Sequence, residues 1–257
     1  MSNSKVVLLA GKGMSTHIVY HALAARFDVA AVILEEKESA WKFIRRRASK
    51  LGWFTAISQV LFQVIIARIL ATTSAGRRKE ILQQYQLNTD EIPGSLIRHV
   101  TSVNTPACID LLRELSPAVV VVNGTRIISG KVLRAVPVPF INMHAGITPR
   151  YRGVHGGYWA LVNRDPERCG VTVHLVDTGV DTGNILYQEL IRITDKDNFT
   201  TYPLLQLAAG LPRLCDAVRD ALQQRLQPIT SAETESKQWY HPTLCEYLRH
   251  RLISGVK

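Results

Sequence analysis

The sequence predicts a doubly wound α/β fold with a mostly parallel sheet. Short, continuous apolar runs at residues 5–10, 29–34 and 118–123 are typical of strands that are buried on both faces. The first run leads directly into a glycine-containing loop and a helical pattern that continues to Ala25, which is how such sheets usually begin. With 257 residues, 46% of them hydrophobic, the chain is long enough for one such domain with added elements.

The other elements follow from periodicity and from the positions of glycine and proline. Residues 202–226 have helical spacing, and Pro212 is expected to distort or split that helix. We assign residues 1–195 to a core, and residues 196–257 to a carboxyl-terminal helix and tail packed on that core. The remaining predicted strands are residues 97–100, 137–141, 170–176 and 187–194, and the remaining predicted helices are residues 105–115, 129–135 and 157–163.

A helical insertion is predicted at about residues 40–87. It begins with the strongly basic segment Ala40–Lys50 and continues with the apolar segment Trp53–Ala71, which is interrupted by two glutamines and an arginine. Because such polar residues are costly inside a bilayer, we expect amphipathic helices packed on the core or on a second subunit, and not a membrane span. We interpret Arg45–Arg47 as a solvated face; binding to anionic lipid or to a diphosphate is the alternative.

The net charge of +10 and the isoelectric point of about 9.7 favour anionic partners. Nucleic acid, phosphorylated small molecules, folate polyglutamate and anionic lipid all fit, and charge alone does not choose among them. The four cysteines are scattered without a Cys-x-x-Cys pair, so we expect reduced thiols, with no zinc or other metal site. The opening apolar run is too short for a signal peptide, which predicts a cytoplasmic protein.

Polar residues cluster where two predicted strands end. Asn142 and His144 follow the apolar run at residues 137–141, and a glycine-flanked acidic loop, Asp177–Gly183, follows the strand at residues 170–176. Polar side chains at the mouth of a buried strand indicate a site carried on a rigid scaffold. For a lone histidine, hydrogen bonding to buried backbone groups is the common alternative.

These motifs resemble the formyltransferases that use 10-formyltetrahydrofolate, a family that includes glycinamide ribonucleotide transformylase, methionyl-tRNA formyltransferase and the sugar N-formyltransferases. The resemblance covers roughly residues 5–195, and one departure is Ala145, where many relatives carry proline. It implies a Rossmann-like core and 10-formyltetrahydrofolate as the formyl donor. The family signature is represented, in order, by Asn142-x-His144, Ile147-Thr148-Pro149 and Asp181-x-Gly183.

The resemblance implies that Asn142, His144 and Asp181 are the catalytic residues. When a neutral amine attacks a formyl carbon, negative charge develops on the formyl oxygen and positive charge on the nitrogen. Asn142 and a protonated His144 can donate hydrogen bonds to that oxygen. Asp181 would keep the imidazole charged or oriented, and would collect the proton of the amine directly or through water.

The resemblance also assigns binding residues on the two sides of the site. The glycine-containing loop at residues 11–13 precedes a helix, and its backbone N–H groups suit a phosphate. The folate side is expected to include Gly124, Arg126, Ile127, Ile128, Asp177 and Asp181, and the acceptor side Gly11, Lys12, Gly13, Met14 and Arg152.

A nicotinamide-dependent enzyme is an alternative from another class. The loop after the first strand lacks the third glycine of the dinucleotide fingerprint, because Thr16 stands there, and the Walker pattern is absent. Glu35 and Glu36, however, end the second predicted strand, where a ribose-binding acid would lie. A non-enzymatic RNA-binding or membrane-binding module is the other alternative.

Within the family, the sugar N-formyltransferases fit best. After Thr194 only a helix and a short tail are expected, which argues against the tRNA enzymes, and the glycinamide ribonucleotide enzymes lack an insertion such as residues 40–87. The segment HAGITPRYRGVHGGYWAL, residues 144–161, is most similar to the corresponding segment of enzymes that formylate GDP-perosamine for lipopolysaccharide O-antigen. Enzymes that act on dTDP-linked 4-amino-4,6-dideoxyhexoses come next. We expect no nucleic acid partner and no stable membrane insertion, and leave a homodimer open.

Overall fold

The computed structural model of the protein describes residues 4–231 and 233–257, so the first three residues of the predicted core lie outside the described residues. One seven-stranded sheet organises the fold, in the order β3-β2-β1-β4-β5-β7-β8. Strands β1 to β5 are parallel, whereas β7 and β8 run antiparallel at one edge. The strands are β1 (Val6–Gly11), β2 (Val29–Glu35), β3 (Ile97–Val100), β4 (Val119–Asn123), β5 (Phe140–His144), β7 (Gly170–Leu175) and β8 (Ile185–Leu190). The predicted fold class is confirmed.

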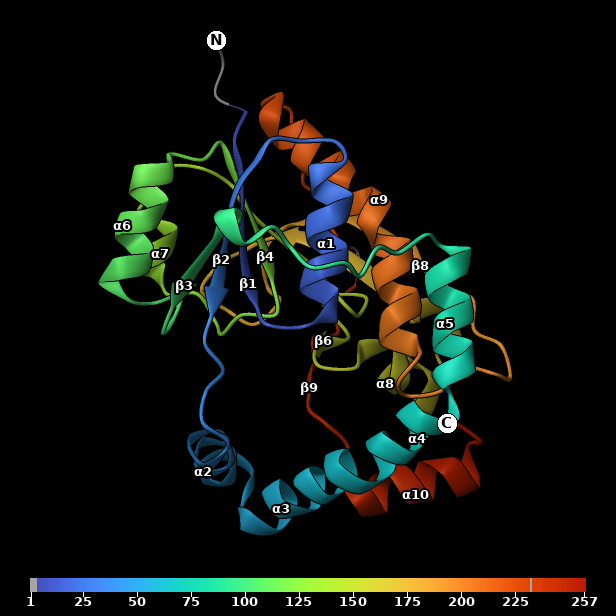
Figure 1. The fold of residues 1–257 in the computed structure, drawn as a ribbon. Coiled ribbons are helices and arrows are strands. Elements are labelled where there is room, and N and C mark those ends of the chain that lie inside the picture. Colours follow the sequence, from blue (N-terminus) through green and yellow to red (C-terminus); the bar gives the residue numbers. More distant parts are fainter. Residues whose placement is uncertain (1–3, 232) are drawn as a thin grey trace.

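Helices cover both faces of this sheet. In Figure 1, α6 and α7 lie on one side of the central strands, and α1 and α9 lie on the other. Each side has its own buried apolar cluster, because alternate residues of the central strands point to opposite faces. The helices of the core are α1 (Met14–Ala24), α6 (Pro106–Leu115), α7 (Gly130–Leu133), α8 (Gly156–Val162) and α9 (Tyr202–Leu222), with 3₁₀ turns at Gly94–Leu96 and Pro166–Arg168.

Helix α9 runs without a break through Pro212. Its buried side, which includes Leu204, Leu211 and Val218, packs against the sheet along its whole length. This packing compensates for the backbone hydrogen bond that proline cannot make. The expected split of the helix therefore does not occur, and the helix belongs to the hydrophobic core.

The predicted insertion is helical, and we call it the arm. It comprises α2 (Ala40–Leu51), α3 (Trp53–Leu61), a π-helical segment (Phe62–Ile66), α4 (Ala67–Thr73) and α5 (Ala75–Gln84). Figure 1 shows α3 and α4 crossing beneath the sheet, with the last helix, α10 (Leu244–Ile253), alongside. By length and composition alone, the helical stretch Trp53–Thr73 is long and apolar enough to cross a membrane, and 22% of its apolar 18-residue window is buried in the protein.

The tail closes over the loop that precedes α8. Strand β9 (Gln238–Trp239) pairs in parallel with β6 (Arg152–Gly153). The indole N–H of Trp239 donates to the Arg150 carbonyl at 3.0 Å. Residues that are far apart in the sequence thereby hold one another in place.

Candidate active site

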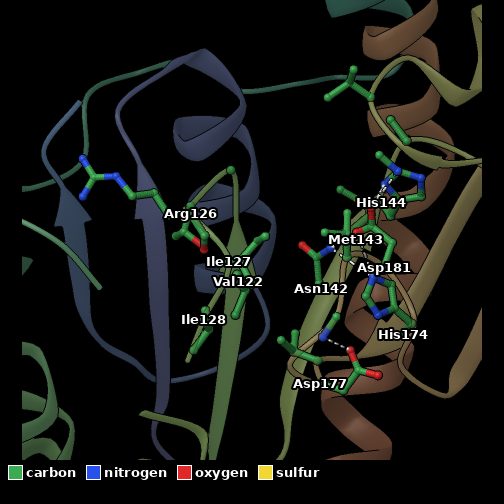
Figure 2. A pocket seen from close by; sticks show the side chains of 18 of the residues that line it. Val122, Arg126, Ile127, Ile128, Asn142, Met143, His144, His174, Asp177 and Asp181 are labelled. Atoms are coloured by element: carbon green, nitrogen blue, oxygen red, sulfur yellow. Dashed lines mark hydrogen bonds and ion pairs between the residues drawn. The ribbon is translucent and has the colours of Figure 1, made fainter. Parts of the chain in front are cut away.

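The reversal of strand direction between β5 and β7 brings three polar side chains together. In this antiparallel pair, Asn142 lies opposite His174 and His144 lies opposite Thr172. Because residues two apart on a strand share a face, Asn142, His144 and His174 lie on the same side of the sheet. Figure 2 shows them converging on Asp181, which comes from the loop after β7.

The carboxylate of Asp181 is the centre of this cluster. Its Oδ2 atom lies 3.3 Å from Nδ1 of His144 and accepts the backbone N–H of Gly153 at 3.0 Å. Its Oδ1 atom lies 3.5 Å from both Nε2 of His174 and Nδ2 of Asn142. Burial acts to raise the pKa of Asp181, but the neighbouring rings of His174 and His144 and the hydrogen bond from the Gly153 N–H outweigh it and lower the pKa. The group is therefore a carboxylate at neutral pH.

The backbone of this loop explains the Asp-x-Gly spacing. Asp181 has a φ of 51°, a left-handed conformation that aspartate tolerates better than most side chains. The guanidinium of Arg152 donates to the Val180 carbonyl at 2.9 Å and supports this turn. At Gly183 a Cβ atom would overlap the carbonyl oxygen of Leu175, so only glycine lets the loop return against the end of β7.

His144 is buried, with an acceptor at each ring nitrogen. Its Nε2 lies 2.7 Å from the Tyr151 carbonyl oxygen, so Nε2 carries a proton and donates it, while Nδ1 faces Asp181. Only a doubly protonated ring would satisfy both acceptors. Burial nevertheless lowers the pKa of His144, although Asp181 and the Tyr151 carbonyl act in the opposite direction. The resulting pair of a neutral imidazole and a carboxylate is a ready proton acceptor.

The amide of Asn142 is oriented by His174. The Nδ1 atom of His174 donates to the Leu175 carbonyl at 2.7 Å, which leaves its Nε2 to accept from Nδ2 of Asn142 at 3.1 Å. Figure 2 shows the Asn142 amide oxygen turned away from His174 and Asp181, toward the side where Ile127 lies. This differs from the expected pose, in which the N–H of Asn142 points at the formyl oxygen. A rotation of the amide by half a turn would present the N–H, and it would require a proton on Nε2 of His174.

These groups form the polar end of a cavity of about 430 Å³. The rest of the wall is largely apolar, and the loop at residues 177–183 also contributes Asp177 and Gly179. A mostly apolar cleft with a few converging polar groups is typical of a small-molecule site. The apolar wall consists of Val122, Ile127, Ile128, Met143, Val154, Val176, Val180 and Pro203.

Comparison with known protein families gives one match that spans these elements. The model described as formyl transferase matches residues 67–204, more than half of the 257 residues. The chain belongs to the formyltransferase family. The formyl donor of this family is 10-formyltetrahydrofolate.

Similar proteins include several kinds of formyltransferase. The methionyl-tRNA formyltransferase of Caldanaerobacter subterraneus subsp. tengcongensis is 30% identical over 148 residues, which are 57% of this chain and 47% of that protein. The chain thus spans about half the length of the curated relatives it matches.

Two solved structures show the likeness of the fold. Glycinamide ribonucleotide transformylase 1 of Symbiobacterium toebii has a TM-score of 0.56 at 20% identity, covering 90% of this chain and 92% of that one. A sugar 3N-formyltransferase solved in the presence of dTDP and 5-N-formyl-THF has a TM-score of 0.54 at 15% identity, covering 92% of this chain and 69% of that one. At these identities the likeness concerns the fold.

The residues expected on the folate side of this formyltransferase all line the cavity, as do the expected catalytic residues. The expected acceptor-side residues do not line it. The guanidinium of Arg152 instead bonds to the Val180 carbonyl and to the Ser236 hydroxyl, and the loop Gly11–Met14 lies at the end of β1. The predicted residues that line the cavity are Gly124, Arg126, Ile127, Ile128, Asn142, His144, Asp177 and Asp181.

The loop on the folate side is held by Glu35. The buried carboxylate of Glu35 accepts the Arg126 backbone N–H at 2.9 Å and its guanidinium at 3.2 Å. It also accepts the Val103 N–H at 2.9 Å and the Ser102 hydroxyl at 3.1 Å. These contacts occupy both carboxylate oxygens, so Glu35 is not available to bind the ribose of a nicotinamide cofactor. The geometry thus argues against the nicotinamide-dependent alternative.

Two residues of the site were missed by the sequence analysis. His174 lies within a predicted strand, and only the register against β5 reveals that it faces Asn142. Glu35 was considered only as a ribose ligand, because the brace that it forms joins three segments distant in sequence. The sequence offered one signal for His174. It is a single histidine, two residues after Thr172, within a strand predicted to be buried.

We expect Glu35→Ala to destabilise the protein by about 3 kcal/mol, because it leaves the guanidinium of Arg126 without its buried partner. The loop at residues 124–128 would loosen, so affinity for folate would fall as well. Denaturant unfolding and a folate fluorescence titration measure the two effects. Glu36→Ala is the matched control, since the protein uses the Glu36 carbonyl and not its side chain. A Glu35→Ala protein as stable as this control would contradict the role of Glu35 in holding the loop at residues 124–128.

Proposed function

We propose that this formyltransferase moves the formyl group of 10-formyltetrahydrofolate to the amine of a nucleotide-linked 4-amino-4,6-dideoxyhexose. The observation that carries the proposal is the cluster of Asn142, His144 and Asp181 at the polar end of a largely apolar cavity. A flat, aromatic pterin fits such a wall, and the exposed side chain of Ile127 offers it an apolar contact.

When bound, 10-formyltetrahydrofolate supplies the electrophilic formyl carbon. Asp181, which is ionised and paired with His144, accepts the proton that the attacking amine loses. As the bond between the formyl carbon and N10 breaks, this proton is returned to N10, and tetrahydrofolate leaves. Asn142 donates to the formyl oxygen after its amide rotates, a pose that requires His174 to take up a second proton and donate it from Nε2 to the amide oxygen. The apolar wall excludes water, which strengthens these interactions.

A second cavity supports an anionic acceptor. It has a volume of about 470 Å³ and shares Thr125, Arg126 and Ile127 with the first cavity. Its other side is formed by α2, through Arg46, Arg47 and Lys50 among others. The concentration of positive charge next to the catalytic cavity fits a diphosphate.

Arg47 is the residue of this second cavity that most lacks a partner. Its Nη1 atom is buried and has no hydrogen-bond partner among the described residues. Burial, together with the charge of Arg46, lowers the pKa of Arg47. A diphosphate would satisfy the buried nitrogen and relieve the repulsion between the two arginines. The loop Gly11–Gly13 with Lys12 is the alternative position for this group.

We favour GDP-perosamine as the acceptor and a dTDP-linked amino sugar next, for lipopolysaccharide O-antigen synthesis in the cytoplasm. The sugar 3N-formyltransferase solved with dTDP is a fold relative that supports a nucleotide handle. Glycinamide ribonucleotide and methionyl-tRNA are the alternative acceptors, since enzymes named for them are also similar to this chain. The chemistry at Asp181 is the same for all of these acceptors.

The acceptor is tested by release of tetrahydrofolate from 10-formyltetrahydrofolate in the presence of each acceptor. We expect the nucleotide-linked amino sugar to be used far better than the same sugar without its nucleotide, because the remote handle orients the amine. Equal use of both sugars would refute a nucleotide-sugar enzyme. Preference for glycinamide ribonucleotide or methionyl-tRNA would establish the corresponding alternative.

Arg47→Ala should lower kcat/KM for the nucleotide-linked sugar by roughly tenfold or more, through the loss of charge-assisted hydrogen bonds. Arg45→Ala is the matched control, because Arg45 is an exposed neighbour outside the lining of the second cavity. An equal effect of both substitutions would point to general electrostatics and not to a built phosphate site.

A further inference from the structure

The arm exposes an unusually large apolar surface. Phe54 is 81% exposed and Trp53 is 52% exposed, whereas soluble proteins rarely leave several large apolar side chains uncovered together. These residues recur every three or four positions, so they share one side of the helix. The outer face, as we call this surface, also includes Trp41, Ile57, Leu61, Val64, Ile65 and Ile69.

The opposite side of the same helix is fixed to the domain. Gln59 is buried and donates to the His241 carbonyl at 2.6 Å. The ring of Phe62 is fully buried and lies 4.9 Å from that of Phe199 and 5.0 Å from that of Tyr247. A membrane-spanning orientation would break these contacts. The helix is therefore held flat against the protein, with its outer face uncovered.

The charge carried by this stretch of the arm itself is of one sign. Residues 40–76 include six arginines and lysines and no acidic residue. Lys42 and Arg68 are exposed and form no ion pair with any residue in the described part of the chain. A second copy of the chain, packed here about a twofold axis, would set like charges against each other. An anionic lipid surface would instead be complementary.

The aromatic residues favour the same partner. The rings of Trp41 and Trp53 lie 6.1 Å apart where α2 meets α3, next to the basic residues of α2. Tryptophan beside lysine and arginine is the usual composition at the boundary between lipid headgroups and acyl chains. Most of the outer face precedes residue 67, where the match to the family begins.

We propose that the outer face of the arm binds the surface of an anionic phospholipid bilayer. The helix lies in the plane of the membrane, with Trp53, Phe54 and Ile57 inserted at the acyl boundary and the basic residues against the lipid phosphates. The protein is then a peripheral membrane protein with no spanning segment. Because α2 also lines the second cavity, this arrangement holds the acceptor side of the enzyme near the membrane.

Flotation of the full chain with large vesicles tests this proposal. The vesicles are made of phosphatidylcholine alone or of phosphatidylcholine mixed with phosphatidylglycerol. We expect binding to the anionic vesicles that weakens with salt, and at least tenfold weaker binding to the neutral ones. A double substitution, Phe54→Ser with Ile57→Ser, should abolish binding. The control, Leu190→Ser with Ile229→Ser, removes two exposed apolar side chains outside the arm and should leave binding unchanged.

The contribution of positive charge to membrane binding is tested with a second pair of double variants. Lys42→Gln with Arg68→Gln should weaken binding to anionic vesicles by about fivefold for each charge removed. Arg113→Gln with Lys131→Gln removes the same charge from α6 and α7 and should have little effect.

Three outcomes would overturn the proposal. They are no flotation with either vesicle, flotation unaffected by the loss of Phe54 and Ile57, or a soluble dimer that this double substitution disperses. Formyl transfer with soluble substrates, measured on the same variants, should be unchanged. Failure of formyl transfer with intact vesicle binding would reject the proposed function and not the membrane surface.

Discussion

A His144→Asn variant is expected to keep its fold and its affinity for folate but to lose turnover by about 10²–10³-fold, the usual effect of removing one catalytic hydrogen-bonding group. The reason is that asparagine cannot reproduce the ring that joins the Tyr151 carbonyl at 2.7 Å to Asp181 at 3.3 Å. The attacking amine would then transfer its proton to an Asp181 that no longer has the imidazole of His144 beside it. Single-turnover kinetics with a folate titration separates the chemical step from binding.

His155→Asn is the control for this substitution. His155 lines the same cavity and is half-buried, but its Nε2 pairs with His241 at 3.1 Å and not with Asp181. We expect it to change turnover much less than His144→Asn does. Near-normal turnover in the His144 variant would reject the catalytic role of that residue.

Asp181→Asn is expected to be at least as damaging, with a loss on the order of 10³-fold in kcat. An amide at this position cannot accept a proton. In one of its two orientations its NH₂ group would also face the Gly153 N–H, which now donates to the carboxylate. Folate affinity and kcat are measured separately, because the same loop lines the folate cavity.

Asp177→Asn is a control from the same loop. The Asp177 carboxylate accepts the Gly179 N–H at 2.9 Å and the Thr182 hydroxyl at 2.7 Å, contacts that organise the loop and not the catalytic cluster. Its substitution should affect folate affinity more than kcat. If Asp181→Asn retained both folate affinity and kcat, Asp181 would be a structural loop residue.

The pH profile of kcat/KM follows from the same carboxylate. Because its pKa is lowered, Asp181 remains ionised through the mildly acidic range. The acidic limb of the profile should therefore belong to protonation of the acceptor amine, and it should move when an acceptor of different amine basicity is used. A profile flat from mildly acidic to neutral pH would contradict the scheme.

The sequence predicts the scaffold well because buried parallel strands leave long apolar runs. It also points to Asn142, His144 and Asp181 through their resemblance to the family motifs, and the structure brings these three side chains together. It could not predict the role of His174, since that depends on the register between β5 and β7. Nor could it predict which side of the arm is covered, because an apolar run at residues 53–71 fits burial on any side.

The pairing of β6 with β9 has a consequence for how the enzyme is made. Gly153 donates to the Asp181 carboxylate, and its own strand is completed only by Gln238 and Trp239. On the ribosome, more than eighty residues must be added after Gly153 before its partner strand exists. A nascent chain that has already formed the sheet and the folate cavity thus still lacks a secured Asp181. The contact between Gly153 and Asp181 is therefore stabilised only after residues 238 and 239 have been synthesised.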